Sequence, residues 1–148
     1  MPGGLDFASW SGEHWVMAGM REDYIERMIK QLVSALAAIA KAGRGQKTDE
    51  ALELVRQTSL SLFGMEYRTL ITFDAASVAE LLGTPEKILA LVRLLSAEAD
   101  LLEQRGDMEG VSHRLGHALA LSRHAQAKKA TPEGEALLQA VSDRLSAL

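Results

Sequence analysis

The sequence predicts an all-α fold, and three observations carry this prediction. Aromatic residues make up only 5% of the 148 residues and there are 3 prolines, while alanine and leucine are abundant, a composition that favours helix over strand. Apolar residues recur three and four positions apart along most of the chain, as on one face of a helix. Thr84-Pro85 and Thr131-Pro132 combine an N-cap residue with a proline at the first helical position. We expect five long helices and one short helix within residues 20–148.

The first 19 residues differ from the rest of the chain. They contain both tryptophans, Trp10 and Trp15, and show no helical stripe. Two interpretations remain open: an unstructured leader, or an arm whose tryptophans dock on this domain or on a second copy, since large aromatic side chains favour a pocket. Residues 1–19 also contain no Lys or Arg, so we expect no secretory signal there.

Two helices are expected to follow as an antiparallel hairpin. The first covers about residues 21–41 and the second about residues 49–63, with Thr48 as its N-cap. The linker between them is short, which favours antiparallel neighbours. The apolar stripe of the first helix consists of Ile25, Met28, Ile29, Leu32, Val33, Leu36, Ile39 and Ala40.

The middle of the chain is expected to form a turn, then a short helix over residues 75–82 capped by Asp74, then a long helix over about residues 85–105. This long helix is apolar on nearly all sides, so it lies either at the centre of the domain or in a dimer contact. We expect Leu91, Leu94 and Leu101 at such a contact.

Two more helices are expected over about residues 108–128, capped by Asp107, and 132–145. His113, His117 and His124 share one face of the first of these, roughly opposite its apolar stripe. We interpret this face as exposed to solvent. The alternative is a protein that binds a small molecule or a metal ion through His113 and His117. Two histidines four residues apart on a helix can bind one ion.

The segment over residues 95–123 reads LSAEADLLEQRGDMEGVSHRLGHALALSR and resembles a tetratricopeptide (TPR) motif. Small Ala99 and the turn glycine Gly106 match that motif. The sequence departs from it at Glu98, where an apolar residue is usual, and at Arg123, where proline is usual.

The wider layout also resembles a known family. The segments DYIERMIKQLVSALAAI (residues 23–39), TDEALELV (48–55) and LLEQRGDMEG (101–110) are similar to a family of small, uncharacterised bacterial TPR-like proteins, over about residues 20–148. The resemblance implies a compact stack of helical hairpins. It implies no catalytic or binding residue.

Several classes of function are disfavoured by the sequence. The chain has no Cys and a net charge of −4, so we expect no thiolate chemistry and no binding to nucleic acid or membranes. It contains no G-x-S-x-G elbow or phosphate loop. We expect a cytoplasmic, non-catalytic module that uses no cofactor, binds a protein or peptide and forms a homodimer. The expected contact residues are Leu91, Leu94, Leu101, Trp10 and Trp15.

Overall fold

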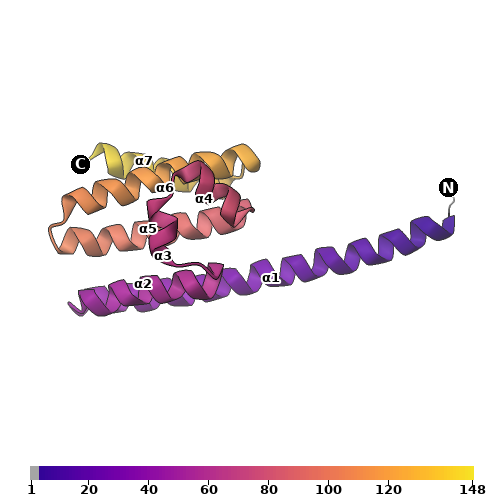
Figure 1. The fold of residues 1–148 in the computed structure, drawn as a ribbon, viewed down its shortest axis with the longest axis horizontal. Helices are drawn as coiled ribbons and strands as arrows, with labels where there is room; N and C mark the ends of the chain where they lie inside the picture. Colours follow the sequence, from indigo (N-terminus) through magenta and orange to yellow (C-terminus); the bar gives the residue numbers. More distant parts are fainter. Residues whose placement is uncertain (1–3) are drawn as a thin grey trace.

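The computed structural model describes residues 4–148, with side chains from residue 19 onward, and this part of the chain contains seven helices and no strand (Figure 1). The all-α prediction is confirmed. None of the helices in the described residues is long and apolar enough to cross a membrane. The helices are α1 (Gly4–Arg44), α2 (Thr48–Phe63), α3 (Tyr67–Thr72), α4 (Ala75–Leu82), α5 (Pro85–Gln104), α6 (Met108–Lys128) and α7 (Pro132–Ser146).

The first helix is longer than predicted. It begins at Gly4 rather than near residue 21, and its N-terminal half projects beyond the other helices (Figure 1). The sequence has no proline between Pro2 and Pro85, and extending an existing helix by one more turn costs little. A segment without an apolar stripe can therefore still be helical. Trp10 and Trp15 lie outside the side chains that the structure describes.

Four helices begin at the capping residues that the sequence predicts. The side chains of Asp74, Thr84, Asp107 and Thr131 each accept a hydrogen bond from the backbone N–H three residues later, at 2.9 to 3.3 Å. Each bond satisfies one of the N–H groups that a helix start leaves unpaired. These caps define the starts of α4, α5, α6 and α7.

The predicted cap at Thr48 is wrong. Thr48 is the first residue of α2, and the cap position belongs to Lys47, which makes no capping bond through its side chain. The turn between α1 and α2 is tight: Gln46 adopts a left-handed conformation with φ of 59°, and the Lys47 N–H donates to the Ala42 carbonyl at 2.9 Å. Backbone hydrogen bonds thus connect the two helices without a side-chain cap.

Helix α5 lies at the centre of the fold. It packs against α1 and α2 on one side and against α4, α6 and α7 on the other. In Figure 1 it lies between the pair α1–α2 and the pair α6–α7. The prediction that α5 is buried on several sides is confirmed. The predicted dimer contact is wrong for its three leucines: Leu91 and Leu94 are 0% exposed and Leu101 is 3% exposed, so the domain's own helices cover them.

The segment before α4 was predicted as a turn, but it contains the six-residue helix α3. Tyr67 and Leu70 of α3 are buried. A helix this short has little stability of its own, so its tertiary contacts hold it in place. The sequence pattern, which favours no single structure here, does not reveal those contacts.

Replacing Leu91 by alanine tests its place in the core. We expect Leu91→Ala to lower the free energy of unfolding by about 2 to 5 kcal/mol, because it leaves a cavity inside a packed core. Leu60→Ala, at a leucine that is 48% exposed on α2, should change it by less than about 0.5 kcal/mol. Urea denaturation measures both. Unchanged stability in Leu91→Ala would contradict the position of α5 at the centre.

Candidate functional site

A groove runs along the surface between α1 and α7, with α5 as its floor. One part, of about 340 Å³, lies near Met28, and a second part, of about 510 Å³, lies towards Arg44. Leu36 and Arg93 line both parts, so the two parts adjoin along α1. The lining of both parts is largely apolar, and this groove is the candidate binding site.

The α1 wall of the groove exposes apolar side chains. Met28 and Leu32 turn towards the core and are 4% exposed, whereas their neighbours Ile29 and Val33 are 47% and 61% exposed and line the groove. The apolar stripe of α1 is therefore wider than the surface that α2 and α5 cover. Its outer edge stays open to solvent beside the floor of the groove.

Charged residues line the rim and the ends of the groove. Arg93 on the floor pairs with Glu133 of α7 at 2.5 Å, and Asp100 pairs with Arg144 of α7 at 2.7 Å. These two ion pairs neutralise charges along the α7 wall. Arg44 lines one end of the groove and Lys129 the other, and neither pairs with a carboxylate among the described side chains.

One polar atom in the groove lacks a partner. Oε1 of Glu86 is buried and accepts no hydrogen bond from any group in the described part of the chain, and Glu86 lines the smaller part of the groove. A buried acceptor without a donor costs about 1 to 3 kcal/mol. A bound partner that supplies an N–H or O–H at this point would recover that free energy.

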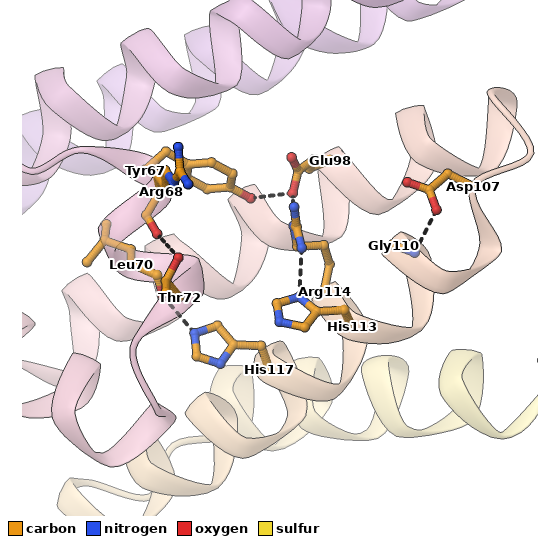
Figure 2. A network of polar contacts seen from close by, with 10 residues as sticks. All are labelled: Tyr67, Arg68, Leu70, Thr72, Glu98, Asp107, Gly110, His113, Arg114 and His117. Atoms are coloured by element: carbon orange, nitrogen blue, oxygen red, sulfur yellow. Dashed lines mark hydrogen bonds and ion pairs between the residues drawn. The ribbon is translucent and has the colours of Figure 1, made fainter.

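A polar cluster outside the groove joins α3, α5 and α6 (Figure 2). The Tyr67 hydroxyl donates to Oε1 of Glu98 at 2.8 Å, and Nε of Arg114 donates to the same oxygen. Tyr67 and Glu98 are 4% and 7% exposed. A carboxylate with two donors is stable when buried, whereas a lone one is not. The cluster fastens α3 to α5 and α6.

Burial raises the pKa of Tyr67 well above its ordinary value, and the negative charge of Glu98 raises it further. The positive charge of Arg114 opposes this only in part. The Tyr67 phenol therefore keeps its proton and acts as a donor to Glu98. These groups satisfy one another, which is the arrangement of a structural cluster.

Two of the predicted histidines come together beside this cluster. The rings of His113 and His117 stack with centroids 6.2 Å apart. Nδ1 of His113 lies 2.7 Å from the Arg114 guanidinium, and Nε2 of His117 lies 2.8 Å from the Leu70 carbonyl oxygen. A guanidinium can only donate and a carbonyl can only accept. His113 therefore accepts at Nδ1, and His117 donates from Nε2.

The solvent-facing interpretation of the histidine face is wrong for His117, which is half-buried under α3. Burial lowers the pKa of His117, and the hydrogen bond to Leu70, which favours the charged ring, opposes this only in part. Because its Nε2 is bonded to the Leu70 oxygen, that nitrogen is not free for a metal. The described residues contain no group of three or more His, Asp or Glu that could hold a metal ion.

The structure thus changes the set of candidate contact residues. Leu91, Leu94 and Leu101 belong to the core, while Ile29 and Val33, which the sequence analysis assigned to a single apolar stripe, line an open groove. One signal was available: the apolar stripe between positions 25 and 40 contains eight residues, more than one packing face requires. Glu98 carried a signal too, as a carboxylate at a position where the TPR motif usually has an apolar residue.

Comparison of the chain with protein-family models, with curated proteins and with solved structures finds no match.

Stability at mildly acidic pH tests the environment of His117. The pKa of His117 is lower in the folded protein than in the unfolded chain, so the unfolded chain binds more protons and stability falls as pH drops through about 6.5. We expect this loss between pH 7.5 and 5.5 to be smaller in His117→Gln than in the wild type, as measured by urea denaturation. His124→Gln controls for replacing a histidine on α6. An equal loss in His117→Gln and the wild type would refute this role.

Proposed function

We propose that this chain is a non-catalytic protein-interaction module, built from TPR-like helical hairpins, that binds an amphipathic helix in the groove between α1 and α7. One observation carries the proposal: Ile29 and Val33 remain exposed in the part of the groove near Met28, whose floor is α5. A helix that lays its apolar face into such a groove buries these side chains, which is a recurring mode of peptide recognition.

The arrangement of the helices supports this proposal. The hairpins α1–α2 and α5–α6 pack on each other through α5, and stacked hairpins of this kind form extended concave surfaces. An apolar strip with charged groups at both ends matches a helix that has one apolar face and polar flanks. Outside the groove, the buried groups Tyr67 and Glu98 are bonded to each other, and Glu98 also to the part-buried Arg114. This favours a structural role for them over a catalytic one.

Selection of peptides tests the groove. A displayed library of amphipathic helices is selected against the wild-type chain, and the affinity of a selected peptide is then measured for Ile29→Glu and Val33→Glu. We expect each substitution to weaken binding at least about tenfold, because it places a charge where the complex excludes water. The matched control Leu60→Glu changes a leucine on α2 that is similarly exposed but does not line the groove, and it should bind as the wild type does.

Circular dichroism confirms that each variant remains helical. The proposal is wrong if the selected peptides bind Val33→Glu as tightly as they bind Leu60→Glu, or if the library yields no peptide that depends on Ile29 and Val33.

A further inference from the structure

We infer that the helix held by this groove is the projecting part of α1, residues 4–27, from a second copy of the chain, in a reciprocal antiparallel dimer. We call residues 4–27 the arm. The inference rests on the proposed function, since it names the occupant of the same groove.

The arm has a helical backbone and exposes most of its described side chains to solvent. Near its base, Tyr24 lies beside α5, with Nζ of Lys87 5.3 Å from the centre of its ring. Figure 1 shows it projecting away from the other six helices. Met28 is the first α1 residue that is buried, and of the described side chains before it, only Ile25 is partly covered. A helix of this length extends about 36 Å at 1.5 Å per residue. Most of the stability of helices in proteins comes from the packing of one face, so a partner that covers the arm would stabilise it.

The length and direction of the arm match the groove. The groove follows α1 from Met28 to Arg44, about 24 Å, and the arm is long enough to span it. A two-fold axis near residues 27 and 28, where the arm leaves the body, lays each arm along the partner's groove. The two α1 helices then run antiparallel, and each copy gives and receives the same contact, as a two-fold interface requires.

The charges of arm and groove are complementary. The acidic residues of the arm are Asp6, Glu13, Glu22, Asp23 and Glu26, and its basic residues are Arg21 and Arg27. The groove charges without an ion-pair partner among the described side chains are Arg44 at one end, and Lys129 with the carboxylate of Glu86 in the other part. With the two-fold axis near residues 27 and 28, position 13 of the arm lies opposite position 42, close to Arg44, and positions 22 and 23 lie opposite positions 33 and 32, in the part of the groove that Lys129 lines. Attraction of this kind sets the direction and register of a contact.

The arm also carries the large apolar residues that the groove requires. Both tryptophans of the chain, Trp10 and Trp15, belong to it. In the antiparallel arrangement their positions lie along the larger part of the groove, of about 510 Å³. Tryptophan is well suited to such contacts because one side chain buries a large apolar area.

Sedimentation velocity on the full chain tests the dimer. We expect the wild type and the control Leu60→Glu to be dimers at about 100 µM, and Val33→Glu and the double variant Trp10→Ala/Trp15→Ala to be monomers, with dissociation constants raised at least about tenfold. Urea denaturation checks that each variant is folded. A monomeric wild type at this concentration overturns the inference, and a groove that still binds selected peptides would then leave the proposed function standing.

Mixing the two monomeric variants separates this arrangement from pairing of the arms alone. Val33→Glu has an intact arm, and Trp10→Ala/Trp15→Ala has an intact groove. In the mixture, the arm of the first variant can bind the groove of the second. We therefore expect a heterodimer, although neither variant forms a homodimer. Direct pairing of arms predicts that Val33→Glu remains a dimer and that mixing restores nothing. Either result overturns the inference.

Discussion

Ile88, Leu91, Leu94 and Leu95 of α5 are fully enclosed, and a helix can be enclosed on that many sides only by several neighbours. Each such side chain contributes roughly 1.5 to 3 kcal/mol when it leaves water. The helices that pack against α5 are α1, α2, α4, α6 and α7. The burial of α5 therefore constrains how the other helices are placed around it.

The groove is a consequence of the same arrangement. Helix α1 contacts α5 along one edge and α2 along another, so only part of its wide apolar stripe is covered. Because α7 meets α5 on the other side, the floor between α1 and α7 stays open and Val33 remains exposed. The apolar surface available to a partner is thus the part of α1 that packing around α5 leaves exposed.

Sequence reasoning succeeded for features that depend only on residues close together in the chain. Asp74 caps a helix through a bond to a residue three positions away, and such signals need no knowledge of the fold. It failed where the deciding contact is distant. The partner of Glu98 is Tyr67, 31 residues earlier in the chain, and periodicity alone does not tell whether Leu91 or Val33 is the one that other helices cover. Charge and apolar spacing identify candidates, but only tertiary packing assigns them to core or surface.

Amide hydrogen exchange along the whole chain tests the central place of α5 most directly. If α5 organises the fold, its amides exchange only when the whole domain unfolds, so they are the slowest in the protein. Amides of α3, which depend on contacts with α5 and α6, should exchange faster. Exchange in α5 as fast as in α3, or protection concentrated in another helix, would contradict the account.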